Sequence, residues 1–486
     1  MGDRLTPRDL TFLVEERPSA PRHNATVEIF EPGPEGFRYD DLVALVEDRL
    51  SFVPRYRQKL RFMPGGVANP VWVDDPAFDI SYHVRLSALP RPGSAEELED
   101  LVGRIVARPL DRQRPLWEMY LIEGVDGGES GRFAILTKSH QALVDGVETI
   151  DLGHLLLDLK PDVDLLGEDV GHAPPSARPT AMRMLLGVAH DALTDPHMVL
   201  ETVSSRGLVL ARAVNRAARL SRGQERITPL TGRLSQQRRF VGVDTPLADL
   251  RRVRSVHGGT VNDVILAVIA GALRSWLMSR TESVGGLRQL RAVVPVAVID
   301  ENEEATSLGS QIAVHVVDLP VGEASPVVRL HQVSWSFESH QEAGRGVPAS
   351  RLAGITGFAP TTFHAVGNRA AAARPDDSYH LVVTNVPGPQ TPLYAASARM
   401  VATYPVPPLT PGHALTIGVT SYDGTVYLGI NTDRDLIPDT ETLRQCFVEA
   451  IDELVDSASG TRQRAPRGRA PGTTSDTPST QTGSDS

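Results

Sequence analysis

The sequence contains little cysteine and no long apolar run, and each shortage excludes a class of protein. Cys446 is the one cysteine among 486 residues, which excludes a disulfide framework and a Cys-rich zinc or iron–sulfur site. Its helix-like surroundings predict a small core residue. The longest apolar run, residues 264–273, is about half as long as a bilayer-spanning helix. No apolar signal region opens the chain, so we expect a cytoplasmic protein and not an integral membrane protein.

Several common motifs are missing as well. The sequence has no GxGxxG, P-loop, HExxH or GxSxG pattern, which argues against the usual nucleotide-binding, zinc-protease and serine-hydrolase sites. His154 and Asp158 have HxxxD spacing but no third ligand nearby, so no metal site is predicted. A formal net charge of −11 at pH 7 argues against a nucleic-acid-binding protein.

Changes in composition divide the chain into four parts. Residues 1–170 alternate short strand-like and helix-like segments, and residues 238–456 do the same. Residues 171–237 begin as a Pro-rich spacer and continue as a basic, helical connector. Residues 457–486 are rich in Ser, Thr, Gly and Pro and predict a disordered tail. We therefore expect two domains joined by a connector.

The first domain contains a strand-to-helix corner at residues 138–146. Residues 115–122 and 133–139 are typical of two strands around a Gly-rich turn, and the apolar spacing becomes helical after Gly146. His140 then stands at a strand end, with Asp145 five residues later. Such a corner can hold an imidazole at the open end of a sheet. The Asp would fix the conformation of the corner, and the Gly would permit a close approach of the backbone. On spacing alone, a histidine at such a corner is more often structural than catalytic.

The second domain has a clear helix start. Thr260 and Asp263 have capping-box spacing, and the apolar residues that follow predict a buried helix. Capping explains the neighbouring Asn262, although a role in a site is also open. Five segments are typical of strands: residues 292–298, 312–317, 380–383, 414–420 and 425–430.

In this order and spacing, the motifs resemble the bacterial wax ester synthase/diacylglycerol acyltransferase family, which belongs to the CoA-dependent acyltransferases with an HHxxxDG motif. The similarity covers most of the chain. Besides the corner and the helix start, it is carried by residues 72–83, 111–118, 291–298, 385–389, 412–415, 421–422 and 433–435.

The resemblance implies an α/β (α+β) fold of two chloramphenicol-acetyltransferase-like domains, with the active site and a substrate tunnel at their interface. It implies transfer of an acyl group from acyl-CoA to diacylglycerol, or to a long-chain alcohol as in wax esters. No permanently bound cofactor is expected, because acyl-CoA is a substrate. Because these substrates are lipids, the protein could contact the inner membrane face or lipid droplets peripherally, and this expectation is left open.

The resemblance also implies site residues. The catalytic corner would contain His140, Gln141, Asp145 and Gly146. Substrate binding would involve Pro115, Leu116, Trp117, Asn262, Asp263 and His413. Packing is the favoured explanation of Trp117 even within this motif, and His413 is open to a core, surface or tunnel-lining role. In the basic connector, Arg212, Arg216 and Arg219 would share a helical face. That face suits either a solvated bridge or contact with anionic lipid or a CoA phosphate.

One residue departs from the family motif. Aligning Asp145 and Gly146 places Gln141 where the family has its second His, which is usually given the role of general base. A glutamine amide does not titrate near pH 7, so Gln141 can only donate or accept hydrogen bonds. In one account His140 becomes the base and Gln141 gives polar support in a working acyltransferase. In a second account the protein binds acyl-CoA or lipid with little turnover, and in a third the hydroxyl acceptor is different.

Overall fold

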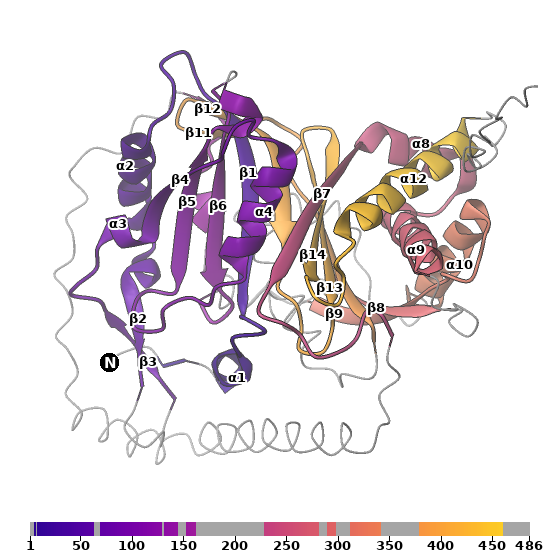
Figure 1. Cartoon of the computed structure of the whole chain (residues 1–486), viewed down its shortest axis with the longest axis horizontal. Coiled ribbons are helices and arrows are strands. Elements are labelled where there is room, and N and C mark those ends of the chain that lie inside the picture. Colours follow the sequence, from indigo (N-terminus) through magenta and orange to yellow (C-terminus); the bar gives the residue numbers. More distant parts are fainter. Residues whose placement is uncertain are drawn as a thin grey trace, which may run out of the picture.

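Two six-stranded mixed sheets form the frame of the protein and lie side by side (Figure 1). The computed structural model describes residues 4–62 without Thr6, 69–128, 131–143, 152–161, 228–280, 289–297, 312–341 and 379–459. The basic connector, Asp145 and Gly146 lie outside these residues, as does the tail from residue 460 on. The strands predicted at residues 115–122 and 133–139 are confirmed, as are the five in the second half.

The first sheet has the strand order β11-β12-β1-β6-β5-β4, and only β4 and β5 are parallel among its paired strands. Its strands are β1 His23–Glu31, β4 Val84–Ala88, β5 Trp117–Glu123, β6 Phe133–His140, β11 Tyr394–Ala395 and β12 Ala398–Val406. All eight residues of β6 are buried, because both faces of the sheet are covered. Helix α4 (Ala95–Val106) packs on one face and α2 (Tyr39–Leu50) on the other.

Smaller elements complete the first half of the chain. The two-stranded sheet of β2 and β3 lies at the described start of the chain, where Arg4 forms a bridge with Val71 on β3 (Figure 1). The bounds of these elements are α1 Pro7–Glu15, a 3₁₀ turn Pro54–Arg57, β2 Gln58–Arg61, β3 Val71–Asp74, α3 Ile80–His83 and α5 Leu152–Leu155. Of the helix expected after the corner, α5 is therefore the part within the described residues.

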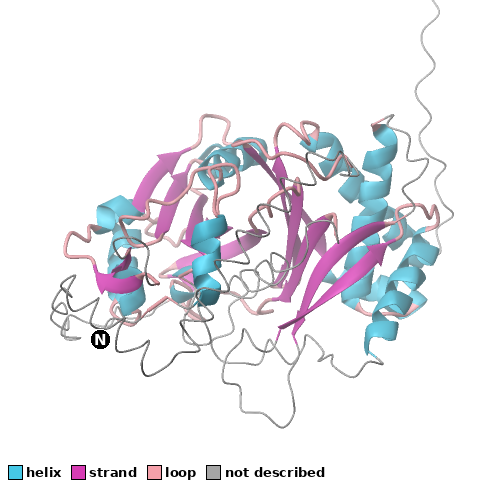
Figure 2. Cartoon of the chain, turned by 90° about the horizontal axis from the view of Figure 1, so that it is seen from below, coloured by secondary structure: helices cyan, strands magenta, loops and turns pink. Residues whose placement is uncertain are grey.

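The second sheet has the strand order β7-β14-β13-β10-β8-β9. Its strands are β7 Arg238–Pro246, β8 Leu290–Ala297, β9 Ile312–Leu319, β10 Leu381–Pro387, β13 Leu415–Tyr422 and β14 Thr425–Asp433. Four helices cover the face that points away from the first sheet (Figures 1 and 2): α8 Leu247–His257, α9 Val261–Ser279, α10 Pro326–Gln341 and α12 Thr440–Ala458.

The predicted helix start at Thr260 is confirmed. The Thr260 hydroxyl accepts from the backbone N–H of Asp263, and the Asp263 carboxylate accepts from the Thr260 N–H at 2.8 Å. Among the described helices, α9 is the one long and apolar enough to cross a membrane, but 72% of the relevant window is buried inside the protein. It is therefore the core helix of the second half. Cys446 on α12 is buried beside it, as predicted.

Strand β12 joins the two halves. It lies within the range predicted for the second domain, yet it pairs with β1, with Ala25 opposite Val406. It also crosses the second sheet over a row of paired glycines, Gly418, Gly429 and Gly242. A Cβ on Gly429 would lie 1.7 Å from the carbonyl oxygen of Pro405. The missing side chains thus allow the two backbones to approach closely.

Helix α4 makes a second junction. The Glu99 carboxylate accepts from the backbone N–H of Gly242 on β7 at 2.8 Å and pairs with Arg444 on α12. Burial raises the pKa of Glu99, although the hydrogen bonds from Arg444 and Gly242 oppose that shift. Helix α12 ends at Ala458, two residues beyond the predicted end of the second domain at residue 456.

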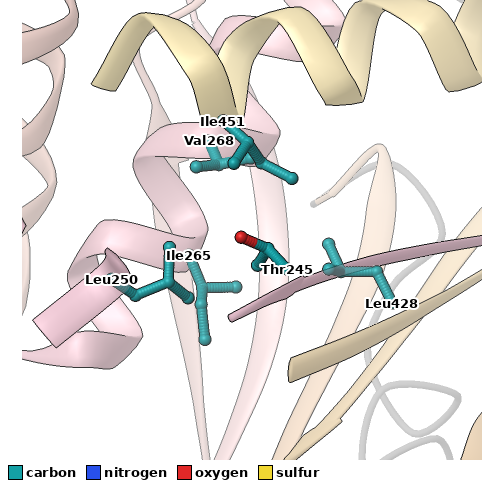
Figure 3. A pocket seen from close by; sticks show the side chains of 6 residues that line it. All are labelled: Thr245, Leu250, Ile265, Val268, Leu428 and Ile451. Carbon is teal, nitrogen blue, oxygen red and sulfur yellow. The ribbon is translucent and has the colours of Figure 1, made fainter. Parts of the chain in front are cut away.

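A small cavity lies in the core of the second half (Figure 3). Its volume is about 10 Å³, about the space of a single water molecule. Apart from Thr245 the lining is apolar and comes from α8, α9, α12 and β14: Leu250, Ile265, Val268, Leu428 and Ile451. A long acyl chain does not fit, so this cavity is a packing gap and not a substrate site.

Candidate active site

The predicted corner begins where β6 ends. The backbone N–H of His140 donates to the carbonyl of Leu116 next to β5, and the N–H of Gln141 donates to the carbonyl of Arg22 next to β1, both at 2.9 Å. The chain turns directly after His140, because the N–H of Leu143 donates to the carbonyl of His140 at 2.9 Å. Strand β6 therefore ends at His140, and Gln141 is the first residue of the turn that follows.

The ring of His140 is fully buried, and its contacts define its tautomer. Nδ1 accepts a hydrogen bond from the backbone N–H of Ala142 at 3.0 Å. A neutral ring then carries its proton on Nε2, because each nitrogen either donates or accepts. Nε2 lies 3.6 Å from the Oε2 atom of Glu16, which is beyond hydrogen-bonding distance but close enough for electrostatic attraction.

Glu16 is a buried carboxylate that sequence reasoning did not identify. Its Oε2 accepts from Nε and Nη2 of Arg112 at 3.0 and 2.6 Å, and its Oε1 accepts from the backbone N–H of Arg22 at 3.0 Å. Burial alone would raise the pKa of Glu16. The interactions with His140, the Arg22 N–H and Arg112 outweigh burial and hold this pKa well below its usual range. Glu16 is therefore ionised and faces the ring edge that carries the proton.

This arrangement bears on the role predicted for His140. A general base needs a free lone pair that faces the substrate. The Nδ1 lone pair is engaged by Ala142, and Nε2 carries the proton, so the ring must change its contacts before it can accept one. The observed geometry suits a positioning role, and the assignment of His140 as the base stays a prediction.

Two further polar residues share the face of His140. His23 is the direct partner of His140 across the β1–β6 ladder, and its Nε2 donates to the carbonyl of Val106 at 2.8 Å. Lys138 Nζ donates to the carbonyl of Arg108 at 2.5 Å. Lys138 Nζ also donates to the carbonyl of Ile105 at 3.3 Å, so both side chains bind carbonyls at or just beyond the end of α4. Burial, followed by the charge of Lys138, holds the pKa of His23 well below its usual value.

Lys138 keeps a charge in an almost fully buried site. Burial lowers its pKa to about 8, although Glu118 at 3.5 Å opposes that shift. A lysine inside an otherwise apolar strand was a signal in the sequence, yet nothing there pointed to α4 as its partner. The face of His140 is therefore engaged in holding α4 against the sheet.

The residues predicted from the Pro-Leu-Trp motif lie at the start of β5, next to the end of β6. Leu116 and Trp117 have no exposed surface. The Trp117 indole donates to the carbonyl of Tyr56 at 2.7 Å, and its ring stacks on His83 with centroids 4.5 Å apart. Pro115 is buried beside them. These contacts support the packing interpretation of Trp117, and direct substrate binding by the motif stays a prediction.

The predicted residues of the second half form their own contacts. Asn262 Oδ1 accepts from Asn385 Nδ2 at 2.9 Å, which ties the start of α9 to β10. Asp263 caps the helix and also accepts from Ser334 Oγ at 3.1 Å. His413 is buried and stacks on Tyr379 with centroids 4.1 Å apart. Asp263 thus has a structural explanation, whereas a substrate role for Asn262 and His413 stays a prediction.

Comparison with solved structures defines the class of fold. The first condensation domain of the calcium-dependent antibiotic synthetase matches with a TM-score of 0.53 at 14% identity, covering 95% of this chain and 98% of that one. This likeness concerns the fold alone. It confirms the prediction of two chloramphenicol-acetyltransferase-like α/β domains, here with mixed sheets.

The family follows from closer matches. The wax ester synthase/diacylglycerol acyltransferase catalytic domain matches residues 5–265, and the C-terminal domain of the same family matches residues 308–455. This chain belongs to that family. The structure of the wax ester synthase/diacylglycerol acyltransferase from Marinobacter aquaeolei VT8 matches with a TM-score of 0.65 at 27% identity, covering 94% of this chain and all of that one.

Two relatives from Mycobacterium tuberculosis are named as probable diacylglycerol O-acyltransferases. The one called tgs2 is 32% identical over 462 residues, which cover 93% of this chain and 98% of the relative. The one called tgs3 is 40% identical over 266 residues, which cover 52% of this chain and 96% of the relative. The family prediction from the motifs is therefore confirmed.

Proposed function

We propose that this chain transfers a long-chain acyl group from acyl-CoA to the free hydroxyl of diacylglycerol, with long-chain alcohols as further acceptors. The proposal is supported by the polar corner at the end of the β1–β6 ladder, within a two-domain acyltransferase fold, and it takes Gln141 to stand where the family has its base. Membership of the family supports acyl-CoA as donor and an alcohol as acceptor.

The reaction itself needs one bond formed and one broken. The acceptor oxygen attacks the thioester carbonyl carbon, the carbon–sulfur bond breaks, and the CoA thiolate leaves and takes up the hydroxyl proton. Gln141 contributes hydrogen bonds that orient the hydroxyl or stabilise the negative charge on the carbonyl oxygen. Loss of a dedicated base lowers such rates by about 10²–10⁴-fold. We therefore propose a slow enzyme that works mainly by positioning its substrates.

A second candidate function is binding of acyl-CoA or lipid without appreciable turnover. Two observations favour it: Gln141 cannot titrate, and the Nδ1 lone pair of His140 is engaged by Ala142 while Nε2 faces Glu16 at 3.6 Å. A binder would retain the fold and its lipid affinity, and it would act as a carrier or as the partner of an active relative.

One experiment separates the two. Purified wild type, His140→Ala and Gln141→His are incubated with labelled palmitoyl-CoA and either diacylglycerol or hexadecanol. Gln445→His, on the exposed side of α12, is the matched control for a Gln-to-His change. Slow transfer by the wild type and faster transfer by Gln141→His support the enzyme. No transfer by the wild type, with clear transfer by Gln141→His, refutes the enzyme and supports the binder.

His140→Ala tests the base assignment separately. If His140 is the base, transfer falls by the full 10²–10⁴-fold that an acid–base catalyst contributes. If it only positions the corner, the loss is smaller and does not change the dependence of the rate on pH between pH 6 and 8. Unchanged activity removes His140 from the site altogether.

A further inference from the structure

Residues 16–22 connect α1 to β1 as a closed loop. The Glu16 carboxylate accepts from the backbone N–H of Arg22 at 3.0 Å, which closes the base of the loop. At the tip, Arg17 and Ala20 exchange two backbone hydrogen bonds, of 3.4 and 2.8 Å, across a tight turn. Hydrogen bonds at both places restrict the loop to one conformation, so a displacement of the tip also displaces the base.

The base of the loop contacts two neighbouring residues of the corner. The Glu16 carboxylate lies 3.6 Å from Nε2 of His140. The carbonyl of Arg22 accepts from the backbone N–H of Gln141 at 2.9 Å. The loop therefore restrains both the ring of His140 and the backbone of Gln141.

The tip of the loop is held by the second half of the chain. The carbonyl of Ser19 accepts from Nη2 of Arg238, which is the first residue of β7. Ala20 is 2% exposed and packs in the hydrophobic core of the second half. Ser19 stands midway between Glu16 and Arg22 in the sequence, so the bond from Arg238 acts on the loop between its two contacts with the corner.

The guanidinium of Arg238 has a fixed place. Its side chain is 3% exposed, and Nη1 pairs with Oδ2 of the fully buried Asp433 at 3.2 Å. The Asp433 carboxylate is itself held by three backbone N–H groups, those of Ser235, Asp435 and Leu436. Buried ion pairs often stabilise a protein no more than apolar packing does, so stability alone does not account for this one. What the pair provides is direction, since it aims the second terminal nitrogen at the loop.

We propose that Arg238 positions the catalytic corner from the second half of the chain, acting through the loop of residues 16–22. This proposal rests on the proposed function, because it assumes that the corner takes part in acyl transfer. Arg238 is a positioning residue and has no contact with substrate in this scheme. Its effect on the rate is nevertheless large, since a misplacement of about 1 Å in a reacting group can cost about 100-fold.

The test compares Arg238→Lys with Arg329→Lys in the full chain. The Arg329 side chain is also 3% exposed, pairs with Glu453 and donates to two backbone carbonyls. It joins α10 to α12 on the face that points away from the first sheet, so it is a matched control for loss of a buried arginine. Arg238→Lys replaces the two terminal nitrogens by one, which keeps the charge beside Asp433 but loses the bond to Ser19.

Two measurements report the effect on the corner. Hydrogen exchange of the Gln141 amide, followed by mass spectrometry, reports the bond to the carbonyl of Arg22. We expect this exchange to be about fivefold faster in Arg238→Lys than in Arg329→Lys, the value of one net hydrogen bond. Steady-state acyl transfer reports kcat and KM. In Arg238→Lys we expect kcat to fall about tenfold or more, with KM for palmitoyl-CoA within about twofold of the wild-type value.

The opposite results overturn the proposal. Equal exchange at Gln141 in the two variants means that Arg238 does not hold the corner. Faster exchange in Arg238→Lys with an unchanged kcat means that the contact is structural only. The exchange measurement needs no turnover. Absence of acyl transfer by the wild type therefore refutes the proposed function, and the exchange result still decides whether Arg238 restrains the corner.

A second pair of variants decides the matter if Arg238→Lys does not fold. Ala20→Gly removes the methyl group that packs in the core of the second half. Ser19→Gly gives the same turn equal backbone freedom but keeps that contact and the carbonyl that binds Arg238. Faster exchange at Gln141 in Ala20→Gly than in Ser19→Gly supports the proposal, and equal exchange overturns it.

Discussion

Substitution of Gly429 by Ala tests how the two halves are joined. Gly429 lies on β14 directly beneath β12, and a Cβ there would stand 1.7 Å from the carbonyl oxygen of Pro405, where ordinary contacts begin at 3.4 Å. The obstacle is backbone and not the end of a flexible side chain. To accommodate the methyl group, β12 must shift by about a third of the 4.8 Å spacing between strands.

The expected cost follows from that shift. Overpacking of a well-packed interior costs about 1–3 kcal/mol, and a clash with backbone belongs at or above the upper end of that range. We therefore expect Gly429→Ala to lower the free energy of unfolding by about 3 kcal/mol, measured by urea titration. Because β12 is paired with β1, the neighbour of the strand that ends at His140, acyl transfer should also fall.

Gly232→Ala is the control. Its Cβ would meet only the Leu436 side chain, at 3.2 Å, which can rotate away. We expect a change of less than about 1 kcal/mol and normal activity. Equal stability and activity of Gly429→Ala and Gly232→Ala would refute the idea that the glycine row is what allows β12 to cross the second sheet.

Three further predictions concern buried groups. Lys138 has a pKa of about 8 in the folded chain, against 10.5 when unfolded, so the unfolded chain binds more protons between these values and folding is favoured as the pH rises. The free energy of unfolding of the wild type, relative to that of Lys138→Met, should therefore rise by about 1 kcal/mol between pH 8 and 9 in urea titrations. A difference that stays constant would contradict this. Because the pKa of Glu16 is lowered, the wild type should exceed Glu16→Gln in stability above the unfolded value of 4.5, and this advantage should be lost as the pH falls below it; an advantage that persists in acid would be against the proposed contacts. Thr260→Ala removes the cap of α9 and should cost about 1 kcal/mol in thermal unfolding, whereas no loss would mean that the cap is redundant.

Local signals in the sequence were sufficient for much of the fold. The capping box at Thr260 predicts the start of α9 because all its partners lie within three residues. Short apolar segments likewise predict β5, β6 and the strands of the second half. Such local signals do not predict which distant segments pair with each other. Neither β12 nor its place in the first sheet was predicted, because the glycines that admit it lie on three different strands.

The site divides in the same way. The motif predicts where His140 and Gln141 stand, since the corner is local. The environment that decides their chemistry is not local. Glu16 approaches His140 from the end of α1 and is held by Arg112, 96 residues further on. His23 meets His140 only through the register of β1 with β6. Long-range pairing of this kind leaves no periodic pattern in the sequence.

The most direct test of the proposed function is the formation of triacylglycerol by the purified wild-type chain from labelled palmitoyl-CoA and diacylglycerol. The proposed function predicts labelled triacylglycerol and an equal amount of free CoA, both above the level of a heat-inactivated sample, at a rate that Gln141→His increases. Tight binding of both substrates without labelled product or free CoA would contradict it.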